Sequence, residues 1–120
     1  MFNVLVSNND DHARNHAAFW DGEQLTLTPA YDICPQARSG GEATQVMAIG
    51  RDGWKFSQLA ACVERSTVYQ LPPGSAQEIV DHQVAAIKEN WAAVCDEAGL
   101  TPVERGRLWQ RQFLNPCAFQ

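Results

Sequence analysis

Three oxygen-bearing side chains near the start of the chain have a spacing that suits phosphoryl transfer. Asp10 and Asn15 are five positions apart, and Asp32 follows a segment patterned like a β-hairpin. A kinase needs an aspartate that orients the acceptor hydroxyl, and oxygen ligands that hold a metal ion against the phosphates of ATP. Carboxylate and amide oxygens are ligands that Mg²⁺ prefers. Asp10, Asn15 and Asp32 fit that set.

The same residues also suit a simpler role. Residues 8–11 read Asn-Asn-Asp-Asp, and asparagine and aspartate are common in turns because their side chains bond to nearby backbone groups. Spacing alone favours this polar turn over an active site.

A β-hairpin is predicted over residues 16–28. Two short apolar segments flank Asp21 and Gly22, a dipeptide that favours a type I′ turn with φ > 0 at both central residues. In the second segment Leu25 and Leu27 face one way, and Pro29 ends the strand because proline cannot donate to a ladder. The hairpin would bring Asp32 back beside Asp10 and Asn15.

Residues 2–6 are apolar and alternate weakly, so they fit either a strand or the last turns of a helix. Because a domain seldom opens on a buried apolar run, we expect the chain to be truncated at its N-terminus. Residues 37–41 are small and polar, and we expect them to be mobile.

From residue 54 onward the pattern is helical. Ser57 is expected to cap a short helix with Leu59, Cys62 and Val63 on one face, and residues 71–74 form a break. Ser75 and Glu78 then predict a capping box for a long helix that Gly99 would end. The apolar stripe of this helix would comprise Val80, Val84, Ile87, Trp91, Val94 and Ala98.

The last helix is predicted from Thr101 as cap, Pro102 at the first helical position and Glu104 as the capping-box partner. Its apolar face would consist of Leu108, Trp109 and Phe113, and Pro116 would end it. The predicted fold is therefore α+β and mainly α: a short hairpin carrying a metal-site loop, packed on a helical subdomain. One domain is expected over residues 1–120, with the loops and hairpin in 1–53 and the helical part in 54–120.

Composition narrows the function classes. The chain has 120 residues, 45% hydrophobic and 19% charged, which is typical of a globular domain. Its net charge of −5 argues against direct binding to nucleic acid, which needs basic side chains on the phosphates. No apolar run approaches the roughly 18 residues of a membrane span, and no signal peptide is visible, so we expect a cytoplasmic protein with no membrane partner. The four cysteines form no C-x-x-C pair, three of them lie in apolar stretches, and they are expected to be buried free thiols.

The motif N-x-D-x-H-x-x-N at residues 8–15, then a hairpin, then Thr-Pro-Ala-Tyr-Asp at residues 28–32, resembles the C-terminal region of HipA-type serine/threonine kinases. These are the toxin kinases of bacterial toxin–antitoxin modules. The specific part of the resemblance covers residues 2–35, and residues 54–118 resemble the helical C-lobe of the family in pattern only.

The resemblance implies roles for individual residues. Asp10 matches the catalytic aspartate, and Asn15 and Asp32 match the residues that hold Mg²⁺ and, through it, ATP. His12 matches the motif histidine, which would support the loop or contact phosphate. His12 and His16 also have the i, i+4 spacing that binds zinc on a helix, although the asparagines before them favour a loop.

The chain departs from a complete kinase of this type. It has no Gly-rich loop before Asp10, and its two lysines, Lys55 and Lys88, both follow Asp32. We therefore interpret it as the catalytic-loop and C-lobe part of a HipA-like kinase, inactive alone, which needs an N-terminal lobe from the same gene or a separate chain. The resemblance suggests an aminoacyl-tRNA synthetase as substrate and an antitoxin as partner. The alternative is a non-catalytic remnant that binds an antitoxin or a partner lobe.

Overall fold

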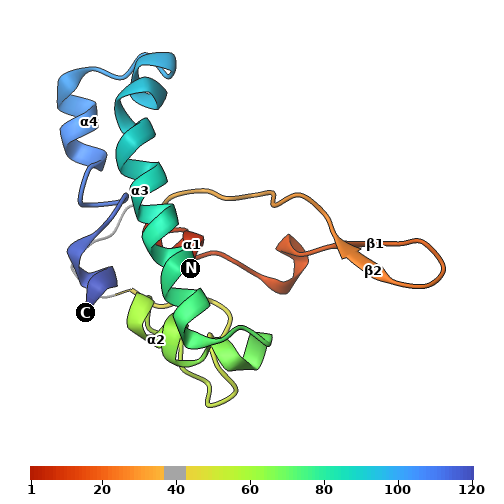
Figure 1. Cartoon of the computed structure of the whole chain (residues 1–120). Coiled ribbons are helices and arrows are strands. Elements are labelled where there is room, and N and C mark those ends of the chain that lie inside the picture. Colours follow the sequence, from red (N-terminus) through yellow and green to blue (C-terminus); the bar gives the residue numbers. More distant parts are fainter. Residues whose placement is uncertain (37–42) are drawn as a thin grey trace.

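The computed structural model describes residues 1–36 and 43–120, so the segment expected to be mobile, 37–41, lies outside the described residues. A mainly helical body carries a two-stranded antiparallel hairpin that extends away from it (Figure 1). This arrangement confirms the α+β, mainly α class.

The 25-residue helix α3, Pro73–Glu97, runs through the length of the body. The short helices α1 and α2 pack against it, and α4 follows it in the chain and lies beside its C-terminal half (Figure 1). The remaining elements, in chain order, are α1 Phe2–Leu5, η1 Ala13–Asn15, β1 Ala18–Trp20, β2 Leu25–Leu27, α2 Leu59–Glu64, η2 Ser66–Tyr69, α4 Pro102–Leu108 and η3 Pro116–Phe119.

Residues 2–6, for which the sequence left two possibilities open, form helix α1 rather than a strand. Val4 and Leu5 are 2% and 0% exposed, because they enter the main hydrophobic core. The other buried members of this core come from the helical part of the chain: Leu59, Cys62, Val80, Leu114 and Ala118. One core therefore joins the N-terminal segment to the helices, and the residues that follow α1 start from a fixed position.

The long helix was predicted with two wrong members in its apolar stripe, Val94 and Ala98, of which Ala98 is exposed and lies just past the end of the helix. Val80 is buried, and Val84 and Ile87 pack against the core. Val94, however, is 55% exposed, and the next residue, Cys95, is buried in its place. The buried position near the C-terminal end of α3 is therefore one residue later than predicted.

The N-terminal cap of α3 was also predicted wrongly. The helix begins at Pro73, with Pro72 as its N-cap and no side-chain cap, so Ser75 lies inside the first turn. Proline is favoured at the first helical position because its missing N–H would have no partner there. The C-terminal end agrees with the prediction, since Gly99 follows the helix with φ +66°.

The predicted capping box of α4 is confirmed. The Thr101 hydroxyl accepts a hydrogen bond from the backbone N–H of Glu104, and the Thr101 N–H donates to the Glu104 carboxylate at 2.8 Å. Hydrogen bonds from the Thr101 hydroxyl and N–H hold the pKa of Glu104 below its ordinary value.

Two other helix predictions need correction. The N-cap of α2 is Gln58, not Ser57, which is buried and accepts a hydrogen bond from Gln45 Nε2 at 2.9 Å.

Helix α4 ends at Leu108, well before Pro116, which starts η3 instead. The chain turns there because the rings of Trp109 and Phe113 pack against the ring of Trp91, with centroid distances of 4.9 and 5.1 Å.

Ser75 and Thr101, two of the residues predicted as caps, provide a direct test of the cap assignments. Thr101→Ala should lower the free energy of unfolding by about 1 kcal/mol, because the N–H of Glu104 loses its acceptor. Ser75→Ala should be neutral or slightly stabilising, since alanine favours a helix interior more than serine. Urea unfolding followed by circular dichroism measures both. A larger loss for Ser75→Ala than for Thr101→Ala would contradict these cap assignments.

The hairpin has the predicted position but not the predicted turn. Trp20 pairs with Leu25, so the four residues 21–24 form the connection, and only Gly22 among them has positive φ. The prediction of a two-residue type I′ turn at Asp21 and Gly22 is therefore wrong. The longer loop forms because the Asp21 carboxylate accepts the N–H groups of Glu23 and Gln24, both at 2.9 Å. These two bonds, with Gln24 contributing most, hold the pKa of Asp21 below its ordinary value.

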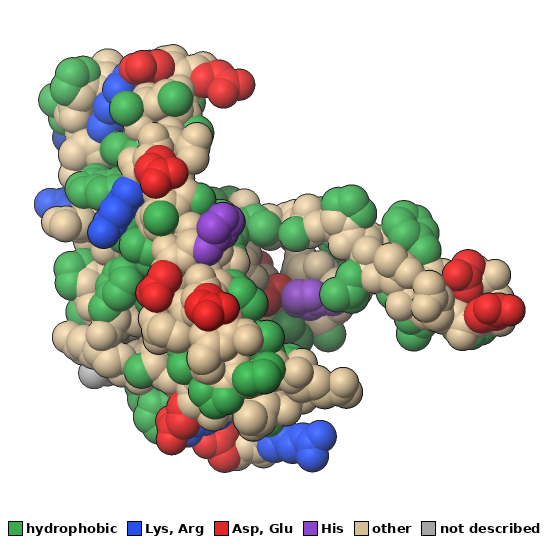
Figure 2. All heavy atoms as spheres, viewed as in Figure 1, with side chains coloured by type: hydrophobic (Ala, Val, Ile, Leu, Met, Phe, Trp, Pro, Cys, Tyr) green, Lys and Arg blue, Asp and Glu red, His purple; other side chains and the backbone are tan. Residues whose placement is uncertain are grey.

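We call residues 16–28 the arm. Its register places Trp20, Leu25 and Leu27 on one face and Phe19 on the other. All four side chains are 62 to 76% exposed. Figure 2 shows hydrophobic side chains along the extended arm and acidic side chains at its tip. An isolated two-stranded hairpin is marginally stable in water, so this apolar surface is suited to being covered.

Candidate functional site

The four residues singled out in the sequence are connected in one series of contacts. The Asp10 carboxylate lies 2.7 Å from His12 Nε2, and the backbone N–H of His12 donates to the Asn15 side-chain oxygen at 2.8 Å. The amide nitrogen of Asn15 donates to the Asp32 carboxylate at 2.5 Å. Asn15 and Asp32 are therefore adjacent although 17 positions separate them, as the hairpin predicted.

Exposure differs along this series in a way that suits the predicted roles. Asn15 is buried, whereas the Asp10 side chain is 65% exposed and the His12 side chain 31% exposed. A base must reach a hydroxyl that arrives from solvent, and a metal ligand must be held in place. The accessible Asp10 and the fixed Asn15 meet these two requirements.

A second carboxylate–histidine pair lies beside the first. His16 Nε2 is 2.9 Å from the Asp11 carboxylate, and the Asp11 side chain is 19% exposed. His12 and His16 thus face different carboxylates, on either side of the single turn η1. Within the described residues, no three His, Cys, Asp or Glu side chains are grouped to hold a metal, which argues against the zinc alternative.

The segment that leads to Asp32 is attached to the 8–15 loop at a second point. The Tyr31 hydroxyl donates to the backbone oxygen of Arg14 at 2.6 Å. Asp32 itself has φ +56°, a left-handed conformation that aspartate tolerates better than most residues. Asp32 thus has this left-handed backbone conformation while its carboxylate accepts the hydrogen bond from Asn15.

Distant residues fix the start of the loop, and the sequence analysis missed them. Ser7 is fully buried with φ +56°, and its hydroxyl donates to the backbone oxygen of Gln112 at 2.6 Å. The backbone oxygen of Asn9 accepts from the N–H of Val46, and its side-chain oxygen accepts from Gln45 Nε2 at 3.3 Å. These partners lie 36 or more positions away, and no local pattern in the sequence indicates them.

The donor set fits Mg²⁺ but provides only part of a coordination shell. Asp32 supplies a carboxylate and Asn15 an amide oxygen, both hard ligands. The Asn15 amide nitrogen is the atom that lies against the Asp32 carboxylate, and the Asn15 oxygen accepts from the His12 N–H, so a metal ion shared by the two residues would require the Asn15 amide to turn. Mg²⁺ commonly uses one or two protein oxygens and completes its shell with water and substrate phosphates. The residues present therefore suit a weakly held ion that a phosphate compound would bind more firmly.

Positive charge is scarce around this group. From residue 15 to residue 36 the chain contains no lysine or arginine, and Arg14 is the basic residue within the motif loop. Asp10, Asp11, Asp21, Glu23 and Asp32 are acidic. A triphosphate would therefore meet mainly carboxylates from these two motifs, and cations to offset its charge would have to come from other segments.

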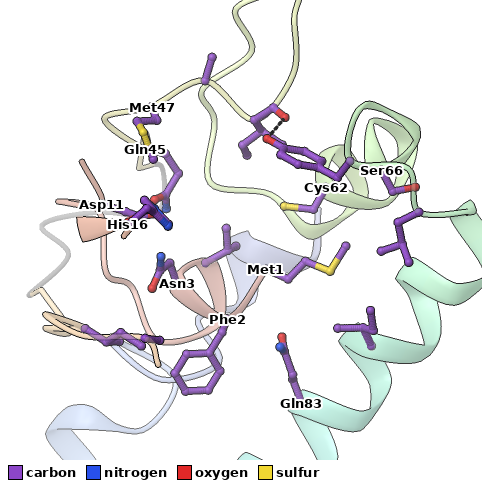
Figure 3. Close-up of a pocket in the computed structure, with 18 residues that line it drawn as sticks. Met1, Phe2, Asn3, Asp11, His16, Gln45, Met47, Cys62, Ser66 and Gln83 are labelled. Carbon is purple, nitrogen blue, oxygen red and sulfur yellow. Dashed lines mark hydrogen bonds and ion pairs between the residues drawn. The ribbon is translucent and has the colours of Figure 1, made fainter. Parts of the chain in front are cut away.

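A cavity of about 490 Å³ lies behind the loop and is lined mainly by apolar side chains. Figure 3 shows Asn3, Asp11, His16 and Gln45 at one end, with Met1, Cys62 and Ser66 at the other. Burial raises the pKa of the Cys62 thiol, so this cysteine stays protonated and acts as a small apolar residue. Asp11 and His16 thus lie between the candidate site and this mainly apolar cavity.

None of the helices in the described part of the chain is long and apolar enough to cross a membrane.

Comparison with known families gives one match: the model of the HipA-like C-terminal domain covers residues 1–91. The matched range includes the whole loop, the arm and most of α3. No curated protein and no solved structure matches the chain significantly.

Proposed function

Because this chain belongs to the family of HipA-like C-terminal domains, we propose that it is the metal-binding and acceptor-binding half of a protein serine/threonine kinase. The complete enzyme would transfer the γ-phosphoryl group of ATP to a protein hydroxyl. The observation that carries the proposal is the contact between Asn15 and Asp32, which joins the two motifs beside Asp10 and His12.

In this proposal each residue of the series has one task. Asp10 accepts a hydrogen bond from the acceptor hydroxyl and orients its oxygen toward the phosphorus atom. His12 holds the Asp10 carboxylate through its ring and holds Asn15 through its backbone N–H. Asn15 and Asp32 hold Mg²⁺, which would neutralise charge on the transferring phosphoryl group.

A second lobe would supply what the described site lacks. Phosphoryl transfer depends almost entirely on positioning and electrostatic stabilisation, and this site offers few cations to the phosphates. The exposed apolar side chains of the arm begin four positions after Asn15 and end five positions before Asp32. A lobe covering the arm would therefore lie directly against the metal ligands.

The acceptor and the regulatory partner follow from the family rather than from the geometry. An aminoacyl-tRNA synthetase is the proposed class of protein substrate, and a DNA-binding antitoxin is the proposed partner. A non-catalytic interaction domain is the second candidate, and the apolar arm is compatible with it because such a surface suits binding whether or not the site reacts.

The isolated chain should show no ATP hydrolysis or autophosphorylation above background, because most of the phosphate-binding groups are missing. Incubation with radiolabelled ATP and Mg²⁺, with Asp10→Ala as the matched variant, measures this. Turnover that disappears in Asp10→Ala would contradict the half-site proposal, since it would mean that these residues suffice. Restoring an ATP-binding lobe should produce activity, whereas a non-catalytic domain would remain inactive.

A further inference from the structure

The outer edge of strand β1 is open to pairing with another strand. All three residues of β1 are exposed, and the arm extends away from the body (Figure 1). The N–H of Thr28 donates to the backbone oxygen of Ala17 at 3.0 Å, which fixes the alternation of hydrogen bonds between the two strands. Every second residue of an antiparallel pair bonds to the neighbouring strand, so the backbone groups of Ala18 and Trp20 point to the outer edge.

The two edges of the arm differ in their protection. Proline and charged side chains are the usual means by which native proteins keep other strands off a sheet edge. Pro29 lies just beyond β2 and has no N–H to donate there. Residues 16–20, which lead into and form β1, contain no proline, lysine, arginine, aspartate or glutamate. The edge of β1 is therefore the one suited to receive a further strand.

We propose that two copies of the chain associate through this edge, with their β1 strands antiparallel and the twofold axis at Phe19. In this register Ala18 of one copy and Trp20 of the other exchange their outward backbone hydrogen bonds. Phe19 then lies opposite Phe19 of the second copy in a non-hydrogen-bonded pair, where side chains are closest. Edge pairing leaves both faces of each arm uncovered, so it is compatible with a lobe on the arm and does not rest on the proposed function.

The pairing also extends the apolar face of the arm. Within one arm Leu27 lies opposite Ala18, and Leu25 lies opposite Trp20. Across the axis Ala18 lies beside Trp20 of the second copy, so the apolar rows of the two copies join. Trp20, Leu25 and Leu27 of both copies then share one face of a four-stranded sheet. Three or more strands with an apolar face are more stable than an isolated hairpin.

A charged pair at the two ends of the arm fits the same register. Glu23 lies in the loop at the tip, where Figure 2 shows acidic side chains, and Arg14 lies at the base. Both are exposed, and neither forms an ion pair within the described part of the chain. The nearby Asp10 and Asp11 carboxylates each contact a histidine. The antiparallel arrangement brings Glu23 of one copy toward Arg14 of the other, whereas a parallel arrangement would bring the acidic tips together.

Sedimentation velocity of the intact chain over a concentration series tests the association. The interface is smaller than that of a stable complex, so we expect a dimer that dissociates on dilution. Phe19→Lys places two ammonium groups opposite each other on the axis and should weaken association at least about tenfold. Val103→Lys on α4 is the matched control and should leave association unchanged, because Val103 is 63% exposed and Phe19 65%. A chain that stays monomeric up to about 1 mM, or a dimer unaffected by Phe19→Lys, would overturn the proposal.

Charge exchange tests the antiparallel direction. Arg14→Glu and Glu23→Arg each bring like charges together and should each weaken association about fivefold. The double variant restores opposite charges and should regain the affinity of the unmodified chain. Lys88→Glu reverses one exposed charge on α3 and is the control. A double variant that associates no better than the single variants would contradict the antiparallel direction.

Disulfide cross-linking tests the register and decides the matter if Phe19→Lys does not fold. The Cα atoms of a non-hydrogen-bonded pair are about 4.5 Å apart, which a disulfide can span. In a Cys34→Ser background, which removes an exposed thiol, oxidation should link two copies of Phe19→Cys. Trp20→Cys should stay unlinked, because its copies lie beyond the reach of about 7 Å. Linkage of Trp20→Cys at the rate of Phe19→Cys, or no linkage of Phe19→Cys, would contradict the axis at Phe19.

Discussion

Replacing Asp10 by alanine, in the chain joined to an ATP-binding lobe, is expected to lower the rate of phosphoryl transfer by roughly 10²–10⁴-fold. The carboxylate is 65% exposed and is held by His12 at 2.7 Å, so it is available to an incoming hydroxyl in a defined orientation. Removing it takes away the group that orients the acceptor and leaves Asn15 and Asp32 in place. The loss should therefore fall on kcat, with little change in the KM for ATP.

A matched variant distinguishes this role from a general effect of charge. Glu89→Ala removes one exposed carboxylate from the middle of α3, away from the loop, and should retain full activity. Steady-state kinetics with a protein acceptor measures both variants. An Asp10→Ala enzyme that keeps more than about a third of the parental kcat would show that Asp10 is not the base.

The largest effect on stability is expected from Leu5→Ala, about 2–5 kcal/mol. Leu5 is 0% exposed and packs among residues from α2, α3 and the C-terminal segment. Its backbone oxygen also accepts the N–H of Leu114 at 2.8 Å. Alanine would leave a cavity at the point where the N-terminal segment joins the helical core.

This substitution should also affect the candidate site, because Leu5 lies two positions before Ser7, where the buried start of the loop is anchored. Val94→Ala is the control, since Val94 is apolar but 55% exposed and should cost less than about 0.5 kcal/mol. Urea unfolding gives both values. A loss below about 1 kcal/mol for Leu5→Ala would mean that the N-terminal segment is not part of the cooperative core.

The features that the sequence predicted correctly are those controlled by local chemistry. The box formed by Thr101 and Glu104 depends on residues three positions apart, and the C-cap at Gly99 depends on one residue. The hairpin of the arm was predicted correctly because its alternating apolar and polar residues and its glycine lie within about a dozen positions. The proximity of Asn15 and Asp32 followed from the arm, since a hairpin returns the chain to its starting point.

The errors arise where distant packing decides between local alternatives. Ser75 is a good cap by type, but the helix begins at Pro73. Trp109 and Phe113 fit a longer α4, yet their rings pack on Trp91 and the helix stops. The turn of the arm is longer than expected, because the Asp21 side chain satisfies the amides of the loop.

The supports of the candidate site could not be predicted for the same reason. The Gln45 side chain and the backbone oxygen of Gln112 contact the residues on either side of Asn8 from positions far along the chain, and neither contact has a local signature in the sequence. The sequence therefore indicates the residues proposed to react, and only the structure shows the groups that hold them.

The central claim is that Asn15 and Asp32 form the metal-binding pair of a phosphoryl-transfer site, and a Mn²⁺ titration of the isolated chain tests it most directly. We expect weak, saturable binding that Asp32→Ala reduces at least tenfold and that Glu89→Ala, which removes one exposed carboxylate elsewhere, leaves unchanged. Equal Mn²⁺ affinity for Asp32→Ala and the unmodified chain, with both folded by circular dichroism, would contradict the claim.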